Sequence, residues 1–463
     1  MKFVRLSALT TFGCILSLAV CAQAQTVTFV YQFTDAATAD SMVQATDGNF
    51  YGTGSGGNFG EGQVFRMTPA GELTTIYSFC SQAKCADGNN PASLIFASDG
   101  NLYGFTDGGN VGKDTGTIFR MTLEGKITTL YNFCPARGCY DGLVPQGIVQ
   151  AADENFYGVA QWGGKKNFGT TFRISPTGEF KLLHTFCEMT NCTDGLLPKF
   201  APVQATDGNF YGTASGGAND AGVFYRLTLD GVYTVLYNFC AVVNCPDGYG
   251  PSGVVQGANG NFYGTTFADG SYGGGTIFEI TSSGEERTLQ SFRVNQGNIP
   301  TYGLTLANDG NFYGATEDDE FNGFGNLFEM TPAGSYTTLY SFGSQGYDPY
   351  SGPLVQGTNG EIYGTTLYSE VGDGGTIFSL DNGLSPLVET APVAGPVGKS
   401  VLILGNGLTG STSVTFNGVE AAFTVESDTY IKATVPTGAT TGTVSVVTPS
   451  GTLNSNPQFV VTK

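Results

Sequence analysis

The stretch Asp47-Gly48-Asn49-Phe50-Tyr51-Gly52 decides the fold of this chain, because near copies of it recur along most of the sequence. The copies follow one another at intervals of 50 to 54 residues. A repeat of this length is typical of an array of similar supersecondary units, each needing its neighbours to cover its apolar face. The seven copies begin at Asp47, Asp99, Asp153, Asp207, Asn259, Asp309 and Asn359.

Each unit is predicted to contain four short β-strands. In the second unit these are residues 93–96, 102–104, 117–122 and 127–133, separated by x-Gly turns and one longer glycine-rich loop. Short strands bounded by Asp-Gly and similar turns indicate antiparallel hairpins. Four such strands in about 50 residues are typical of one blade of a β-propeller.

The two ends of the repeat region are predicted to complete each other. A fourth-strand pattern over Val27–Phe33 precedes any complete unit, and the seventh unit lacks its fourth strand after Leu380. We therefore expect an all-β, seven-bladed propeller over residues 25–380, with the segment near Phe29 pairing beside Phe378, because this removes an open sheet edge. An open solenoid is the alternative. The third strands carry Phe65, Phe119, Phe172, Phe224, Phe278, Phe328 and Phe378, and the fourth strands end at Phe33, Phe79, Phe133, Phe186, Phe239, Phe292 and Phe342.

The repeat resembles a known family at this point. The words D-G-N-F-Y-G-T, G-T-I-F-R-M-T and T-T-L-Y-N-F, spread over residues 27–380, look like the GloVer-type tandem repeat of bacterial secreted proteins. The resemblance implies a β-propeller, and the repeat has no established activity.

The C-terminal part has a different pattern. We expect a Pro/Gly-containing linker over residues 381–396, followed by six short alternating strands over 397–463 that form a small β-sandwich. The words G-P-V-G-K-S-V-L-I-L-G-N-G-L and S-V-T-F-N-G are similar to the IPT/TIG domain, which implies an immunoglobulin-like spacer or interaction module. DNA binding is not expected, because Lys399, Lys432 and Lys463 are the only basic residues after the linker.

Residues 1–24 are predicted to be a secretory signal peptide. Lys2 and Arg5 precede an apolar stretch over 6–20, and Ala22-Gln23-Ala24 fits the small-x-small cleavage rule. No other stretch is apolar enough to span a bilayer, so we expect a protein that is extracellular, on the cell surface or periplasmic. Cys21 fits a lipoprotein box poorly, because Val20 precedes it.

The composition supports a secreted β-protein. Of 463 residues, 69 are glycine, which suits many tight turns, and 13% are aromatic, which can build a core. The formal charge is −20, and loss of Lys2 and Arg5 with the signal would take it to −22. Such a surface disfavours nucleic acids and anionic lipids.

Eight cysteines follow the predicted signal, in four C-x4-C pairs that each stand just after the fourth strand of a unit. Even, regular spacing in a secreted chain predicts disulfides, and each motif contains its own partner. A zinc site is weakly supported, because the only histidine is His184, which stands where sister units have tyrosine. The predicted pairs are Cys80/Cys85, Cys134/Cys139, Cys187/Cys192 and Cys240/Cys245.

Strand direction places all variable sequence on one face of the ring. The glycine-rich loops and the cysteine loops alternate with the short Asp-Gly turns, so both kinds of loop lie at the same end of the blades, as expected of a functional surface. Trp162, the only tryptophan, stands beside Lys165 and Lys166 and could stack on a sugar ring. Packing of Trp162 on a neighbour is the simpler reading.

The run Glu317, Asp318, Asp319 and Glu320 is the only acidic departure from the repeat, and it could bind Ca²⁺ or be a solvated loop. No other cofactor is expected, and His184 is expected to be structural. The leading hypothesis is a secreted, non-catalytic binding, adhesion or scaffold protein for an extracellular glycan or surface protein. The alternatives are a carbohydrate-active hydrolase or lyase with carboxylates at the propeller face, and a purely architectural envelope protein.

Overall fold

The protein is all-β in the part of the chain that the structure, a computed structural model, describes. The described residues are 25–34, 37–109, 115–293, 299–300, 302–317, 324–343, 349, 352–369 and 374–462. Within them the chain forms β-strands and two single-turn 3-10 helices, η1 (Ala83–Cys85) and η2 (Thr190–Cys192), without an α-helix.

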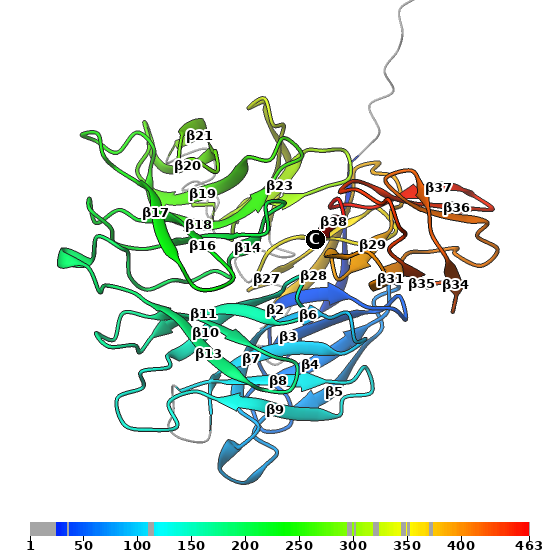
Figure 1. Cartoon of the computed structure of the whole chain (residues 1–463), viewed down its shortest axis with the longest axis horizontal. Helices are drawn as coiled ribbons and strands as arrows, with labels where there is room; N and C mark the ends of the chain where they lie inside the picture. Colours follow the sequence, from blue (N-terminus) through cyan, green and yellow to red (C-terminus); the bar gives the residue numbers. More distant parts are fainter. Residues whose placement is uncertain are drawn as a thin grey trace, which may run out of the picture.

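Seven four-stranded antiparallel sheets occupy the repeat region of the described chain (Figure 1). In six of them the four strands follow one another in sequence order, as expected for a blade built from one unit. These sheets are β2 (Ala39–Gln44), β3 (Phe50–Gly54), β4 (Gln63–Met67) and β5 (Leu73–Ser78); β6 (Asn89–Phe96), β7 (Leu102–Gly108), β8 (Thr117–Met121) and β9 (Ile127–Asn132); β10 (Leu143–Gln150), β11 (Phe156–Trp162), β12 (Thr170–Ile174) and β13 (Phe180–Thr185); β14 (Val203–Gln204), β15 (Phe210–Ala214), β16 (Val223–Leu227) and β17 (Tyr233–Asn238); β18 (Tyr249–Gln256), β19 (Phe262–Ala268), β20 (Gly273–Ile280) and β21 (Glu286–Arg293); β22 (Thr305–Leu306), β23 (Phe312–Thr316), β24 (Asn326–Met330) and β25 (Tyr336–Ser341).

The seventh sheet joins the two ends of the repeat region. It contains β26 (Val355–Gln356), β27 (Ile362–Thr366) and β28 (Thr376–Asp381), and β1 (Thr26–Gln32) is its outer strand. β1 runs antiparallel to β28, and Phe29 lies opposite Phe378. A hydrogen bond also links the seventh sheet to the first, since the backbone N–H of Thr358 donates to Gln44 Oε1 at 2.8 Å.

Hydrophobic clusters between successive sheets hold the ring together. Seven such clusters are found, and each takes its buried side chains from two neighbouring sheets, including one that joins the last sheet to the first. Phe79 and Phe119 illustrate the packing, with ring centroids 5.2 Å apart across the first and second sheets. Burial of large aromatic side chains in this way is the main stabilisation of the blades.

The last glycine of the repeated hexapeptide is required by a close approach. A Cβ on Gly104 would lie 2.6 Å from the tip of the Phe119 ring, which rests on the backbone of the neighbouring strand. In the fourth unit the ring in this place belongs to Tyr225, which pairs with Gly212, and not to Phe224. The sequence alignment of that unit was therefore wrong by one residue, because its third strand carries two adjacent aromatic residues.

The Asp-Gly-Asn turn is fixed by its own side chains. In the second unit the Asp99 carboxylate accepts hydrogen bonds from the Asn101 backbone N–H at 3.1 Å, from Asn101 Nδ2 at 2.8 Å and from the Tyr103 hydroxyl at 2.9 Å. An aspartate that bonds the backbone two residues later is a common way to hold a tight turn. The same three bonds recur at Asp47, Asp153, Asp207 and Asp309.

The C-terminal segment forms two packed sheets around its own core, as a β-sandwich does. Two strands, β29 and β30, fall within the segment that was predicted to be a linker over residues 381–396, so the connection between the two units is shorter than expected. Of the proline and glycine residues there, Gly395 and Pro396 belong to β30. The strands are β29 (Glu389–Ala391), β31 (Ser400–Leu404), β35 (Tyr430–Thr434) and β34 (Phe423–Val425) in one sheet; β33 (Val419–Glu420), β32 (Ser413–Phe416), β36 (Val444–Thr448) and β37 (Gly451–Asn454) in the other; and the parallel pair β30 (Ala394–Pro396) and β38 (Val460–Thr462).

The sandwich contacts the propeller through the short turns (Figure 1). Thr429 Oγ1 donates to the carbonyl of Thr46 at 2.6 Å, and Asn456 Nδ2 donates to the carbonyl of Leu306 at 2.7 Å. Lys399 also forms an ion pair with Glu154. These partners lie on three different sheets of the ring, at or next to the turn between the first and second strands, so the sandwich rests across that face.

Candidate functional site

The propeller has two chemically different faces. The turn face carries the Asp-Gly-Asn turns and the second short turn of each unit, and the C-terminal sandwich rests on it. The loop face carries the glycine-rich loops and the cysteine loops. Backbone bonds join these two kinds of loop, since the N–H of Gly164 donates to Cys139 O at 2.9 Å and the N–H of Gly270 to Cys245 O at 3.0 Å. The expected gathering of variable sequence on one face is therefore observed among the described residues.

The four predicted disulfides are confirmed, each closing its own C-x4-C motif. An aspartate organises each cysteine loop from inside, and in three of the four loops this aspartate is buried. The carboxylate of Asp87 accepts bonds from the Tyr77 hydroxyl at 2.7 Å and from the backbone N–H groups of Ser81 at 3.0 Å and Gln82 at 3.2 Å. Burial and this carboxylate help raise the pKa of Tyr77 to about 12. The aspartate of the Asp-Gly that follows each cysteine pair is thus an anchor of the loop.

His184 occupies the tyrosine position of this network in the third unit. Its Nε2 lies 3.6 Å from Asp194 Oδ2, and its ring stacks on Tyr233 with centroids 3.9 Å apart. Burial lowers the pKa of His184, although the Asp194 carboxylate acts in the opposite direction. The side chain is therefore a neutral packing residue near pH 7, away from the ring axis.

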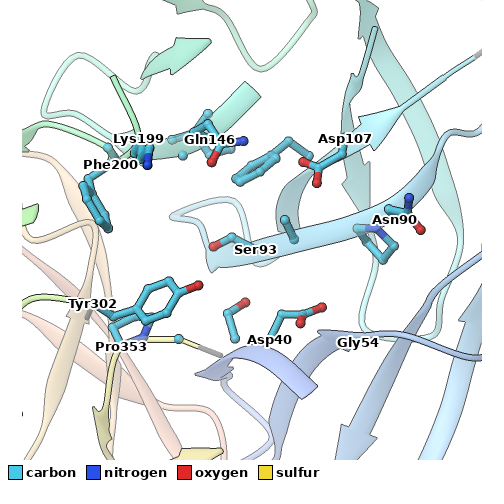
Figure 2. A pocket seen from close by; sticks show the side chains of 18 of the residues that line it. Asp40, Gly54, Asn90, Ser93, Asp107, Gln146, Lys199, Phe200, Tyr302 and Pro353 are labelled. Carbon is cyan, nitrogen blue, oxygen red and sulfur yellow. The ribbon is translucent and has the colours of Figure 1, made fainter. Parts of the chain in front are cut away.

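A pocket of about 540 Å³ lies where the first strands of the sheets converge on the ring axis, and we call it the axial pocket (Figure 2). Its walls come from six of the seven sheets or from the segments leading into them. The lining residues stand at the starts of first strands and the ends of second strands, so the pocket belongs to the loop face. Its chemically distinctive side chains are Asp40, Ser93, Asp107, Gln146, Lys199, Phe200 and Tyr302.

One position of the repeat supplies much of this lining. The residue seven places before each Asp-Gly or Asn-Gly turn is different in every unit, although the surrounding pattern is the same. Six of the seven residues at this position line the pocket. An alignment of the units against one another could have found the pocket by this variable column, which sequence reasoning missed. The seven residues are Asp40, Ala92, Gln146, Phe200, Ser252, Tyr302 and Gly352.

The axial pocket has an acidic side and an aromatic side. Figure 2 shows Asp40 and Asp107 toward one side, with Phe200 and Tyr302 toward the other and Lys199 beside Phe200. Burial raises the pKa of Asp40 to about 7, and the Asp107 carboxylate adds to this effect. The Phe200 and Tyr302 rings meet edge to face, with centroids 6.5 Å apart. The pocket thus offers carboxyl groups, an aromatic wall and one cation.

The predicted ligand-binding group lies outside this pocket. Trp162 ends β11 with 37% of its surface exposed, which leaves its ring accessible at the rim of the loop face. Lys165 forms an ion pair with Glu188 at 2.7 Å, and Lys166 is exposed. The structure brings the three residues together on one loop but not into contact with the axial pocket, so their role stays a prediction.

The predicted calcium site falls largely outside the described residues. Glu317 is described, and its backbone N–H donates to the carbonyl of Ile299 at 3.0 Å. Asp318, Asp319 and Glu320 lie beyond the described part of the chain. Across the part that is described, no three His, Cys, Asp or Glu side chains group closely enough to hold a metal ion.

Exposed apolar side chains gather on the loop face. Of the thirteen large apolar side chains exposed on the described propeller, ten lie on loop-face segments. Apolar and aromatic surface of this kind, left open on one side of a molecule, commonly marks an interaction site. The ten residues are Phe59, Tyr140, Trp162, Met189, Val242, Val243, Tyr249, Phe267, Tyr272 and Tyr368.

Fold and site together define a β-propeller with an open, disulfide-stapled loop face and an immunoglobulin-like sandwich on the opposite face. Residues 7–212 and 188–378 match the Gloeobacter/Verrucomicrobia repeat, and residues 388–461 match the IPT/TIG domain. The chain therefore belongs to the Gloeobacter/Verrucomicrobia repeat family and carries a C-terminal IPT/TIG domain. Both resemblances seen in the sequence are confirmed.

Solved structures of low sequence identity also resemble the chain. A gluconolactonase from Xanthomonas campestris is 10% identical, with 79% of this chain and 93% of that chain covered and a TM-score of 0.41. The calcium-binding protein regucalcin from Agrobacterium tumefaciens is 13% identical, with 64% and 88% covered and a TM-score of 0.38. PorZ, a surface component of the type-IX secretion system of Porphyromonas gingivalis, is 13% identical, with 91% and 59% covered and a TM-score of 0.43. Similarities this distant carry no functional information.

No curated protein sequence matches the chain significantly. Among the described residues, no helix has the length and apolar character needed to cross a bilayer. The four disulfides fit an oxidising, extracellular compartment.

Proposed function

We propose that this protein is a secreted, non-catalytic binding protein that holds an extracellular glycan on the loop face of its propeller. The observation that carries the proposal is the axial pocket, to whose lining six of the seven units each contribute a different residue at the same repeat position. A rigid scaffold with one variable surface is the usual arrangement of a recognition protein. The sandwich on the turn face would leave the loop face free to meet its ligand.

The chemistry of the axial pocket favours a sugar. A sugar ring has an apolar face that stacks on aromatic side chains and hydroxyl groups that need polar partners at its edge. Phe200 and Tyr302 offer the aromatic wall, and Gln146, Ser93 and Asp40 offer polar groups. A volume of about 540 Å³ is within the range typical of small-ligand sites.

The exposed apolar side chains suggest a longer contact than the pocket alone. Trp162 at the rim could stack on a further unit of a glycan chain, with Lys165 and Lys166 nearby. A surface protein is the second ligand class that this face could bind, because exposed Val242 and Val243 suit a protein partner better than a sugar.

A carbohydrate-active hydrolase or lyase is the second candidate function. Its specific support is the carboxyl pair of the axial pocket, since a carboxyl with a pKa of about 7 beside a second carboxyl is the pattern of a general acid. Ligand retention without turnover would separate the binding protein from this alternative.

The test uses the mature, disulfide-bonded protein and a panel of soluble and insoluble polysaccharides, with retention and new reducing ends measured on the same samples. Retention without new reducing ends supports the proposal. Release of reducing ends supports the hydrolase, and Asp40→Asn should then abolish it. A panel with neither retention nor product would overturn the glycan proposal, and a protein ligand or an architectural role would remain.

A further inference from the structure

The axial pocket combines features that point to the charge of its ligand. No hydrogen bond or ion pair from a described residue reaches the Asp40 carboxyl, although protein surrounds it closely enough to raise its pKa to about 7. The Asp40 side chain is partly exposed and lines the axial pocket, so a ligand that enters the pocket can supply the partner that the carboxyl lacks.

The second carboxyl adds a repulsion between like charges. Asp107 lies near enough to Asp40 for its negative charge to disfavour ionisation of Asp40, and both carboxyls line the same cavity. Like charges in one pocket are relieved by a cation placed between them. The lysine that lines the pocket, Lys199, stands beside Phe200 on the other side in Figure 2.

We infer that the axial pocket takes an amino sugar, with its ammonium group between Asp40 and Asp107 and its ring against Phe200 and Tyr302. This inference rests on the proposed glycan-binding function and narrows it to glycans with free, positively charged amines. An ammonium is a donor in three directions, so it can bond two carboxylates at once. Acetylation of the amine removes both its charge and two of its donors.

The groups that face Asp40 across the pocket set the pH dependence. These are Asp107 from β7, Lys199 from the segment before β14 and the Tyr302 hydroxyl from the segment before β22. A cation bound beside Asp40 favours the ionised carboxyl, so binding at pH 6 should release about one proton from the protein. Affinity should therefore rise with pH through about 7 until the amine of the ligand loses its own charge.

The experiment compares glucosamine pentamer with N-acetylglucosamine pentamer by titration calorimetry at pH 6 and pH 7.5, in two buffers of different ionisation enthalpy. The expected result is a preference of about tenfold or more for the free amine, since a hydrogen-bonded charge pair contributes about 1.5–3 kcal/mol. Asp40→Asn should abolish both the preference and the proton release, and Lys199→Gln should strengthen binding of the amine.

Asp107→Asn is the second variant, so that the test survives if one substitution harms folding. Asp99→Asn is the matched control, because it removes a carboxylate from the turn face at a position where two sister units, at Asn259 and Asn359, already have asparagine. It should bind the amine as the unchanged protein does.

The outcomes distinguish failure of the amino-sugar inference from failure of the proposed glycan binding. Equal binding of the two pentamers, a preference for the acetylated one, or retention only of other polysaccharides would overturn the amino-sugar inference and leave glycan binding intact. Absence of retention on every polysaccharide of the panel would overturn both. A preference for the free amine that persists in both Asp40→Asn and Asp107→Asn would move the site away from the axial pocket.

Discussion

The turn face and the loop face use aspartate in opposite ways. On the turn face, Asp99 bonds groups within its own five-residue turn, at the surface. On the loop face, Asp87 is fully buried and gathers the tyrosine of the strand and the backbone of the cysteine loop around it. Each turn-face aspartate serves one turn, whereas each buried aspartate holds a whole loop in place.

This difference explains why one face can vary and the other cannot. A loop anchored by a buried carboxylate and a disulfide keeps its ends fixed, so the residues between them and the pocket beside them are free to change. The turn face has no such spare sequence, since its short turns keep the same three aspartate bonds in five of the seven units and provide the surface on which the sandwich rests.

The largest expected effect tests the buried anchors. Asp87→Ala should lower the free energy of unfolding by about 3 kcal/mol, because it leaves two backbone N–H groups without an acceptor and leaves the Tyr77 hydroxyl only its bond with Ser81. The matched turn-face variant, Asp99→Ala, should cost about 1 kcal/mol, since water can replace its partners. Urea denaturation of both variants measures the difference, and equal losses would remove the contrast between the faces.

The axial pocket gives the next prediction, which concerns pH. Burial raises the pKa of Asp40 to about 7 in the folded protein, so ionisation of Asp40 destabilises the fold. This loss of stability is absent below the unfolded pKa of about 4 and is complete once the pH has risen through about 7. Asp40→Asn should therefore raise the free energy of unfolding by about 2 kcal/mol at pH 8 and leave it unchanged at pH 4. Thermal unfolding at the two pH values checks this, and a gain of equal size at both would show that Asp40 does not titrate as stated.

The disulfides should matter locally. Replacing Cys134 and Cys139 together by serine should cost about 2 kcal/mol, the loop-closure entropy of so short a loop. Hydrogen exchange should become faster in residues 134–142 and in the adjoining glycine loop near Gly164, but not in the turns of the same blades. Faster exchange throughout the propeller would contradict the local role of the bond.

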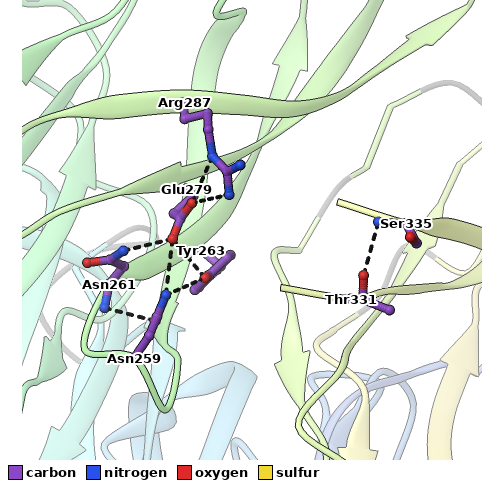
Figure 3. Close-up of polar contacts among 7 residues, drawn as sticks. All are labelled: Asn259, Asn261, Tyr263, Glu279, Arg287, Thr331 and Ser335. Atoms are coloured by element: carbon purple, nitrogen blue, oxygen red, sulfur yellow. Dashed lines mark hydrogen bonds and ion pairs between the residues drawn. The ribbon is translucent and has the colours of Figure 1, made fainter. Parts of the chain in front are cut away.

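The smallest expected effect compares two units of the turn face. In the fifth unit Asn259 replaces the aspartate, and Glu279 accepts the bonds from the Tyr263 hydroxyl and Asn261 Nδ2, together with a bond from Arg287 (Figure 3). Burial opposes ionisation of Glu279, but the bonds from Asn261, Arg287 and Tyr263 outweigh it and lower the pKa. Asn259→Asp should cost about 1 kcal/mol by placing a second carboxylate there.

Units one to four supply the compensation for that change. In these units the turn has an aspartate and the position equivalent to Glu279 has an arginine, as at Asp99 and Arg120. The double variant Asn259→Asp with Glu279→Arg should therefore recover most of the loss, and a double-variant cycle in urea measures the coupling. If the double variant loses as much stability as the two single variants together, the aspartate and the arginine do not stabilise each other.

The repeat made most of the architecture predictable. Period, strand pattern and the odd strand at Val27–Phe33 lead to the observed sheets, because each unit carries the same turn chemistry and the same buried aromatic residues. The C-x4-C spacing was sufficient to predict the four disulfides. The register at Tyr225 was missed because two adjacent aromatic residues fit the same strand position. The strands β29 and β30 were missed because each has only three residues, too few to show an alternating pattern.

The site was harder to predict than the fold. Trp162 stood out as the only tryptophan, and the run from Glu317 stood out as an acidic departure from the repeat. Neither property says where a residue lies in the structure. Asp40 and Asp107 come from different strands of two neighbouring sheets, and only the packing of these sheets around the axis brings them to one cavity. The variable repeat position that contains Asp40 and Tyr302 could be found in the sequence. Its role in the pocket could not be inferred, because the sequence does not show that this position faces the ring axis.

The most direct test of the loop-face account is affinity electrophoresis through gels that contain a polysaccharide retained in the panel. The account predicts that Phe200→Ala with Tyr302→Ala weakens retention by about tenfold or more, while Leu229→Ala with Val232→Ala, which removes exposed apolar surface from a turn on the other face, leaves it unchanged. Unchanged retention of the Phe200 and Tyr302 variant, or its loss in the Leu229 and Val232 variant, would contradict the assignment of the ligand to the axial pocket.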